Sequence, residues 1–238
     1  MWEQGLGRSS LQQGLIMLAA TNPDIALHEV AKLTIGERDR RLLDLRERLF
    51  GSNLVNVVAC PNCNVRVEWN NRIADVLAPA QEQARQTAQG NSFKFEKDSY
   101  SIRFRLPTSL DVVSVSDDVN LENAAYNLCT RCVLSAEYDG EDCPVEVIPA
   151  SVIELIGEQM ELLDPQAEIR MDLICPDCAH SWEVLFDIAS FLWTEFNDWA
   201  ERTLHTIHRL ARAYGWSEQD ILKLSPLRRR LYLGMVGA

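Results

Sequence analysis

The chain has 238 residues, of which 47% are hydrophobic and 24% charged, and its formal net charge is −12. This composition is typical of a globular protein with one or two cores, and it excludes disordered and fibrous classes. The N-terminal apolar run from Leu15 to Ala20 is too short to span a membrane and lacks a signal-peptide pattern, so we expect a cytoplasmic protein without a membrane span.

The negative charge is concentrated in one segment. Residues 108–169 carry 14 Asp or Glu and a single basic residue, Arg131, so the remainder of the chain is nearly neutral. Affinity for bulk nucleic acid requires clustered basic charge, which makes nucleic acid an improbable main partner. The acidic segment is either a solvated face or a docking surface for a basic partner.

Two helices are predicted before the first cysteine motif. The first runs from Leu11 to Ala20 and ends near a turn that contains Pro23. The second runs from Gly36 to Phe50 and is followed by Gly51, a common residue at a helix C-terminus. Its apolar stripe has helical spacing and consists of Leu42, Leu45 and Leu49. The arginine-rich faces of this helix are expected to be solvated and salt-bridged.

Two CPxC motifs, Cys60-Pro61-Asn62-Cys63 and Cys175-Pro176-Asp177-Cys178, are the most informative feature of the chain. Strand-like runs flank them, at Leu54–Ala59, Val65–Trp69 and Ile169–Ile174. A tetrahedral zinc ion prefers four soft thiolates, and two CxxC turns supply these ligands with no position left open for catalysis. We therefore predict one structural Zn²⁺ bound by Cys60, Cys63, Cys175 and Cys178.

The two motifs are separated by 111 residues, far more than the roughly 15 to 20 of a simple zinc ribbon. A folded insert is therefore expected between them, because the entropic cost of closing a loop grows only slowly with its length. Three alternatives remain open for the cysteines: a pair of disulfides, two separate partial sites, or a ribbon that has lost its metal. An odd total of seven cysteines favours a reduced compartment over a disulfide framework.

Within the insert, residues 77–91 resemble a helix tail that passes into a linker. Ser92–Glu96 and Tyr100–Leu106 are predicted to form a hairpin with alternating apolar side chains. Helices are expected near residues 108–116 and 121–136, and another from Pro149 to about Leu163.

A third CxxC, formed by Cys129 and Cys132, lacks the proline and the flanking strands of the other two. It is predicted to be helical, with both thiols on one face of the helix and packed in a core. The alternative is a second metal or redox site together with Cys143.

After the second CPxC motif, a long helix is predicted from Ile188 to Tyr214, with an apolar stripe that serves as core or partner seam. His205 and His208 are interpreted as ordinary residues of its face. Two short helices follow, with N-caps at Ser217 and Ser225. The apolar residues of these two helices either complete the protein's own core or dock a partner. The three consecutive arginines beside them favour docking to a partner with an acidic rim. These residues are Ile221, Leu222, Leu224, Leu227, Arg228, Arg229, Arg230, Leu231, Tyr232 and Leu233.

The predicted fold class is α+β: a zinc-ribbon-like β base built from two distant CPxC knuckles, with a folded α+β insert and flanking helices. Five segments are expected along the chain. They are N-terminal helices at 1–53, the first ribbon half at 54–75, the acidic insert at 76–167, the second ribbon half at 168–187 and C-terminal helices at 188–238.

Four stretches resemble the T4-like phage baseplate protein family, which also occurs in injection systems related to phage tails. They are Thr34–Arg46 running into Phe50-Gly51, the CPxC pair, Phe104–Asp111, and Leu210–Glu218 with Ile221-Leu222 and Arg228-Arg229 after it. The resemblance implies a hub component or hub-assembly factor, with baseplate, hub and spike proteins as partners. It also implies that the protein is in the cytoplasm during assembly or part of the assembled particle.

The sequence favours a protein without enzymatic activity, because it contains no phosphate-binding glycine loop, no HExxH and no GxSxG. The preferred function is therefore a structural or chaperone-like assembly component of a contractile tail or injection machine. The alternative is a zinc-ribbon transcription regulator that binds nucleic acid through its terminal arginines.

Overall fold

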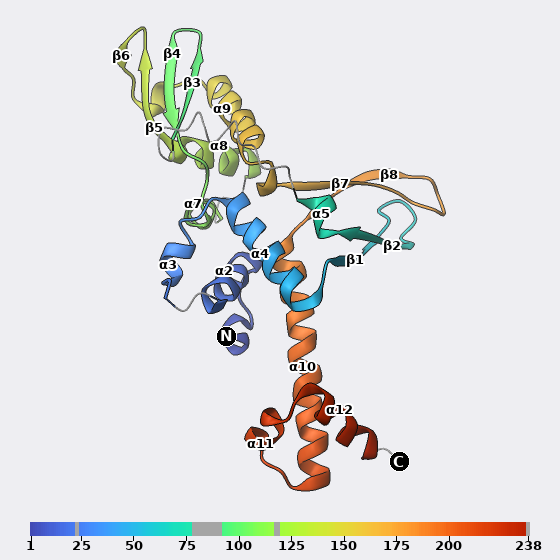
Figure 1. Cartoon of the computed structure of the whole chain (residues 1–238). Helices are drawn as coiled ribbons and strands as arrows, with labels where there is room; N and C mark the ends of the chain where they lie inside the picture. Colours follow the sequence, from blue (N-terminus) through green and yellow to red (C-terminus); the bar gives the residue numbers. More distant parts are fainter. Residues whose placement is uncertain (22–23, 78–91, 117–119, 237–238) are drawn as a thin grey trace.

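The computed structural model describes residues 1–21, 24–77, 92–116 and 120–236. It is elongated, with a head at one end, a helical body from which two β-hairpins project, and a long helix that leads to a small foot (Figure 1). The mixed helix and sheet content confirms the α+β class. None of the helices in these described ranges is long and apolar enough to cross a membrane.

The body is a helical core around α2 (Ser10–Thr21), α4 (Ile35–Phe50) and the first half of α10 (Ile188–Tyr214). Leu42 and Leu43 of α4 are fully buried against Leu192 of α10. Two one-turn helices, α1 (Trp2–Gly5) and α3 (Leu27–Val30), cover this core. The helices predicted from Leu11 and from Gly36 are therefore confirmed to within a residue at each end.

The arginine-rich faces of α4 differ from the prediction. Arg46 is buried and donates to both carboxylate oxygens of Glu195 on α10, at 2.9 and 2.8 Å. Arg38 is also buried, where it pairs with Asp39 at 2.7 Å, while Leu49 of the predicted stripe is exposed. The expected salt bridges are thus confirmed, and they include the exposed pair of Arg41 with Glu37. The expected solvation is wrong for Arg38 and Arg46, because helical spacing alone cannot tell which arginines are buried against other elements.

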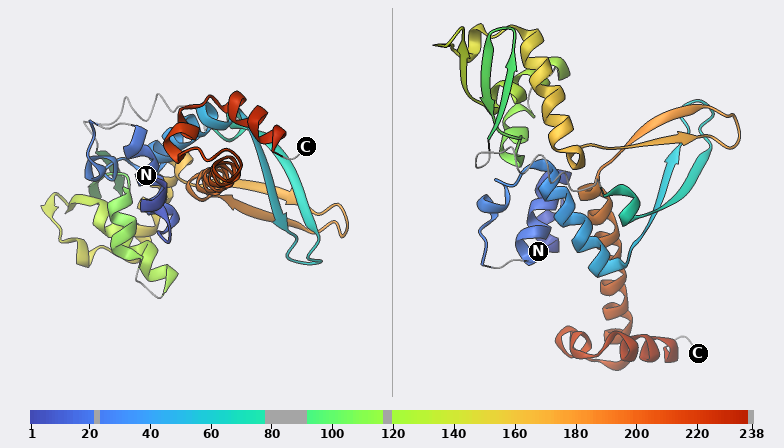
Figure 2. Two further views of the ribbon diagram at one scale, coloured as in Figure 1. Left: turned by 90° about the horizontal axis from the view of Figure 1, so that it is seen from below. Right: turned by 45° about the horizontal axis from the view of Figure 1, so that its top comes forward.

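Two separate hairpins leave the body beside each other. The first consists of β1 (Asn53–Ala59) and β2 (Arg66–Arg72), which leads into α5 (Ile73–Val76), and the second of β7 (Ile169–Ile174) and β8 (Ser181–Phe186). Their bases join the body core through Leu54, Ile73 and Met171. Both hairpins reach away from the body in the same general direction (Figures 1 and 2).

The head comes between the two hairpins in the sequence and has a hydrophobic core of its own. Its antiparallel sheet has the order β3-β4-β5-β6 and packs against two helices. The hairpin pairing Phe93↔Phe104 and Phe95↔Ile102 confirms the predicted alternation. The elements are β3 (Phe93–Lys97), β4 (Tyr100–Phe104), α7 (Ser109–Val115), α8 (Leu121–Cys132), β5 (Val133–Tyr138), β6 (Glu141–Asp142), η1 (Val145–Val147), α9 (Ala150–Leu163) and η2 (Pro165–Ala167).

One helix of the head is shorter than predicted, and one predicted segment lies mostly outside the described residues. The helix expected over 121–136 ends at Cys132, and Val133–Tyr138 instead forms β5, which pairs with β4. This strand pairs with β4, which lies about 30 residues earlier in the chain. Strand formation depends on such a partner, so the local sequence of Val133–Tyr138 did not predict it. The helix tail and linker expected over 77–91 lie, apart from residue 77, outside the described residues.

The head meets the body at the N-terminus of α4. The backbone N–H of Gly36 donates to Oδ2 of Asp164 at 2.9 Å, and that of Ile35 to the carbonyl of Pro107 at 3.1 Å. Arg105 and Thr108 hold Asp111 through bonds of 2.7 to 2.9 Å. Burial alone would raise the pKa of Asp111, but the bonds from Arg105 and Thr108 outweigh it and keep the pKa at about 2.

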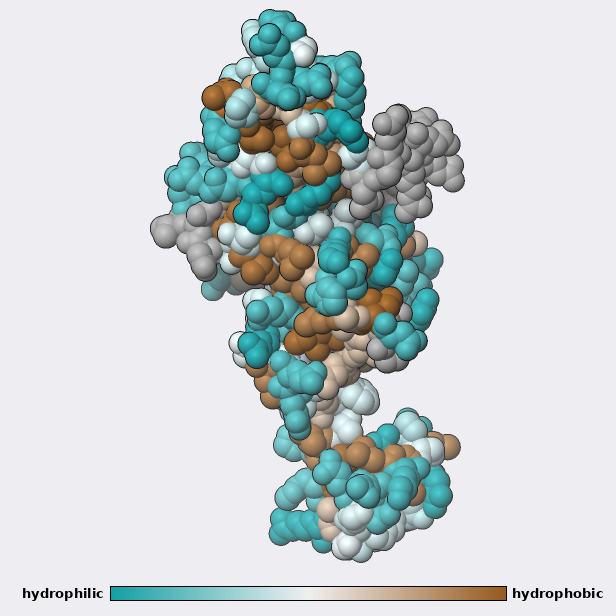
Figure 3. Space-filling model, turned by 90° about the vertical axis from the view of Figure 1, so that its left-hand side faces the viewer, coloured by the Kyte–Doolittle hydropathy of each residue, from teal (hydrophilic) through white to brown (hydrophobic). Residues whose placement is uncertain are grey.

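The foot consists of the distal half of α10 with α11 (Glu218–Lys223) and α12 (Pro226–Met235), and its helix caps at Ser217 and Ser225 are as predicted. Its small core contains Ile207, Leu210 and Ile221 and is separate from the body core. The space-filling view shows a narrow waist between body and foot (Figure 3).

We predict that Gly36→Ala weakens the contact between head and body. A β-carbon at this position would lie 1.8 Å from Oδ1 of Asp164, so Asp164 must move and its bond to the helix N-terminus is lost. The expected cost is roughly 1–3 kcal/mol of unfolding free energy, measured by urea unfolding.

Gly234→Ala is the matched control, because nothing lies within 4 Å of its β-carbon position and alanine favours a helix. It should leave stability unchanged or slightly higher. Equal stability of the two variants would contradict the proposed role of Asp164 as a cap for α4.

Candidate metal centre

The four cysteines of the two CPxC motifs lie together at the tips of the two hairpins. Their sulfur atoms all lie within 4.8 Å of one another. Cys60 Sγ is 3.7 Å from Cys178 Sγ, and Cys63 Sγ is 3.5 Å from Cys175 Sγ, so each close pair joins one hairpin to the other. In the part of the chain that the structure describes, no other group of three or more His, Cys, Asp or Glu residues is close enough to hold a metal ion.

The two turns have the same backbone geometry. Cys60 N–H donates to the carbonyl of Val65 at 2.8 Å, and Cys175 N–H to that of His180 at 2.9 Å. In each turn the residue after the second cysteine has a positive φ, 62° at Asn64 and 56° at Ala179. Non-glycine residues rarely adopt this conformation, so its repetition indicates two turns shaped for the same purpose.

The sulfur distances distinguish between the alternatives for these cysteines. A disulfide has an S–S distance of about 2.05 Å, and the observed 3.5 and 3.7 Å are far longer, with all seven cysteines free. A tetrahedron with metal–sulfur bonds of about 2.3 Å has edges of about 3.8 Å. The four sulfurs therefore fit one shared tetrahedral ion better than two disulfides or two partial sites.

The surroundings of the cluster are partly apolar. Cys60 and Cys175 are 1% exposed and pack with Val67, whereas Cys63 lies at the surface. Trp182 lies against the same cluster and stacks on the ring of His180. Two of the four thiols are therefore shielded from water, whereas that of Cys63 is open to solvent.

Hydrogen bonds contribute to different pKa values for two of the thiols. The side chain of Asn62 donates to Cys178 Sγ across the two hairpins at 3.5 Å and, together with the His180 backbone, lowers the pKa of Cys178 to about 6. The Val65 backbone lowers the pKa of Cys63, but its neighbouring thiols and burial outweigh this and raise it to about 12. One thiolate thus forms readily, and a bound cation would supply the charge that favours deprotonation of the rest.

The third CxxC lies apart from this cluster, in the last turn of α8 within the head. Cys132 is fully buried and Cys129 partly buried, and burial raises the pKa of both thiols, that of Cys132 to about 12. The predicted helical position and core packing are thus confirmed. His205 and His208 lie exposed on α10, and neither belongs to the group formed by the four cysteines.

Sequence reasoning missed Asn62 as a partner of the cluster, although its place inside the first CPxC motif was a usable signal. It also missed a groove in the foot between α10 and α12, which encloses about 300 Å³. Its lining combines residues that are about 30 positions apart in sequence, so no local pattern could reveal it.

The fold and the cysteine cluster define a mixed helix-and-sheet protein with a candidate structural thiolate centre. A family model described as T4 bacteriophage base plate protein matches residues 16–193. This match covers most of the chain, and the chain belongs to that family of baseplate proteins. Searches of the curated proteins and of the solved structures gave no match.

The matched region runs from α2 into the first half of α10 and includes both hairpins and the head. Of the four stretches that resemble the family, the one that begins at Leu210 in the foot lies outside the matched region. Membership supports a structural role in a phage baseplate and interaction with other baseplate proteins.

We predict that Cys60→Ser and Cys175→Ser each lower the metal content and the melting temperature together. Each removes a buried ligand, and binding energy at such a site is also folding energy. The measurement is elemental analysis of protein purified without chelator, beside a thermal melt.

The double replacement of Cys129 and Cys132 by Ala is the matched control. It should keep the full metal content and cost roughly 1 kcal/mol or more per site through small cavities. A control that lost metal as the Cys60 variant does would show that the metal is not held by the CPxC cluster alone.

Proposed function

We propose that this protein is a non-enzymatic structural or chaperone-like assembly component of the baseplate of a contractile phage tail or a related injection system. The observation that carries the proposal is the family match over residues 16–193. The partners would be other baseplate, hub or spike proteins, and the protein would act in the cytoplasm during assembly or within the finished particle.

The proposal includes a structural Zn²⁺ bound by Cys60, Cys63, Cys175 and Cys178, with the two hairpins as the halves of a zinc ribbon. The sulfur separations and the all-thiolate ligand set support zinc as the ion. With all four positions taken by protein, such an ion would have no open site for catalysis. It would instead fix the hairpins relative to the body.

The proposed division of the chain follows from this arrangement. Segments 54–75 and 168–187 form the ribbon, 76–167 forms the acidic insert, and 1–53 and 188–238 supply the helices. In this interpretation the ribbon is the rigid base, and the head and foot present surfaces to other components. A zinc-ribbon transcription regulator remains the second candidate, favoured only by the basic foot and opposed by the net charge of −12.

We predict that tails produced without this protein lack complete baseplates, as seen by electron microscopy of purified particles. The wild-type protein and the variant with Ala at Cys129 and Cys132 should restore them, and Cys60→Ser should not, because the hairpins lose their connection. Mass spectrometry of the restored particles separates a resident component from a transient assembly factor.

Normal baseplates in the absence of the protein would overturn the assembly role. Salt-dependent retention on DNA, combined with normal tails, would favour the regulator.

A further inference from the structure

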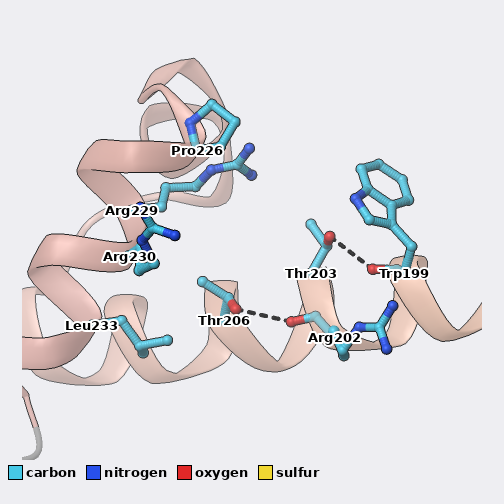
Figure 4. Close-up of a pocket in the computed structure, with 8 residues that line it drawn as sticks. All are labelled: Trp199, Arg202, Thr203, Thr206, Pro226, Arg229, Arg230 and Leu233. Carbon is cyan, nitrogen blue, oxygen red and sulfur yellow. Dashed lines mark hydrogen bonds between the residues drawn. The ribbon is translucent and has the colours of Figure 1, made fainter. Parts of the chain in front are cut away.

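The groove in the foot lies between the distal half of α10 and α12. Trp199, Arg202, Thr203 and Thr206 line it from α10, and Pro226, Arg229, Arg230 and Leu233 line it from α12. Figure 4 shows the side chain of Arg229 extending from α12 toward α10. The lining therefore combines apolar side chains with three guanidinium groups.

The foot as a whole is basic, unlike the rest of the molecule. Residues 199–236 carry seven Lys or Arg and three Asp or Glu, a net charge of +4. Trp199 is 48% exposed. No ion pair among the described residues involves Arg202, Arg229 or Arg230. Arg202 and Arg230 are exposed and Arg229 is partly exposed.

The head carries a surface of the opposite kind on α9. Glu154, Glu158 and Glu161 are exposed at positions i, i+4 and i+7, which places them along one side of the helix. Leu162, 62% exposed, lies beside the last two. None of these carboxylates is in an ion pair within the described part of the chain.

We propose that the groove in the foot binds α9 from the head of a second copy of this chain. Three carboxylates beside an exposed leucine complement the three guanidinium groups and the apolar side chains that line the groove. Within one chain the two surfaces cannot meet, because they lie at opposite ends of the molecule (Figures 1 and 2). The helix α10, whose 27 residues span about 40 Å, runs from the body into the foot and keeps the foot apart from the head.

The same charges exclude the simpler arrangement in which two feet pair. A symmetric contact between two copies of the groove would bring Arg229 and Arg230 against their own counterparts. A head-to-foot contact is instead heterologous, and it leaves one free head and one free foot at the ends. Repetition of such a contact gives a closed ring or an open filament.

The test is sedimentation velocity of the full-length, metal-loaded protein over a concentration series. We expect the wild type to self-associate at low ionic strength and to dissociate at about 1 M salt, where charges are screened beyond about 3 Å. This salt dependence requires no variant. A wild type that stays monomeric at every concentration at low ionic strength would overturn the proposal.

Charge reversal then identifies the surfaces. Arg229→Glu with Arg230→Glu, and separately Glu158→Arg with Glu161→Arg, should each weaken association about tenfold or more. A mixture of the two variants should associate again, because the reversed foot meets the reversed head. Both variants should have the circular dichroism spectrum and the metal content of the wild type. A change in association would then not be caused by loss of the fold or of the metal at the four cysteines.

Arg209→Glu with Arg212→Glu is the matched control, because it makes the same charge change on α10 outside the groove lining. Association reduced equally by this control would mean that only bulk charge matters, and would contradict the proposal. A mixture that fails to associate would do the same. Loss of retention on DNA in the foot variant, without any wild-type self-association, would assign the groove to nucleic acid instead.

Discussion

Four sulfur atoms from parts of the chain that are separated by 111 residues lie together, and a metal ion bound to them would fix the relative positions of the two hairpins. Each hairpin is fixed to the body at its base, through Leu54 in one and Met171 in the other. At the tips, the close sulfur pairs each cross from one hairpin to the other. By the loop-closure model used for disulfides, a cross-link by a shared metal ion over a loop of this length would stabilise the fold by about 4–5 kcal/mol.

The head is attached to the rest of the molecule through a second, smaller set of contacts. Two of the stretches that resemble the baseplate family meet there: Thr34 caps α4, and its backbone bridges to Thr108 beside the Arg105–Asp111 pair. Backbone contacts between those two stretches, together with the bond from Gly36 to Asp164, therefore hold the head on the N-terminus of α4. The head and the hairpins consequently leave the body as separate projections, which suits a protein that contacts several neighbours.

Much of this arrangement was predictable from local patterns. The bounds of α10, β7 and α9 follow from apolar periodicity and cap residues, and the four cysteines follow from two matching CPxC turns. What local patterns could not give depends on distant partners. Val133–Tyr138 is a strand because β4 lies beside it, and Arg46 is buried because Glu195 lies opposite on another helix. The groove in the foot likewise exists only once α12 folds back on α10.

X-ray absorption spectroscopy at the zinc edge, on protein purified without added metal, is the most direct test of the shared centre. The account predicts one zinc per chain with four sulfur ligands at about 2.3 Å and no nitrogen or oxygen ligand. A site with fewer than four sulfurs, or protein free of metal whose four cysteines form two disulfides, would contradict it.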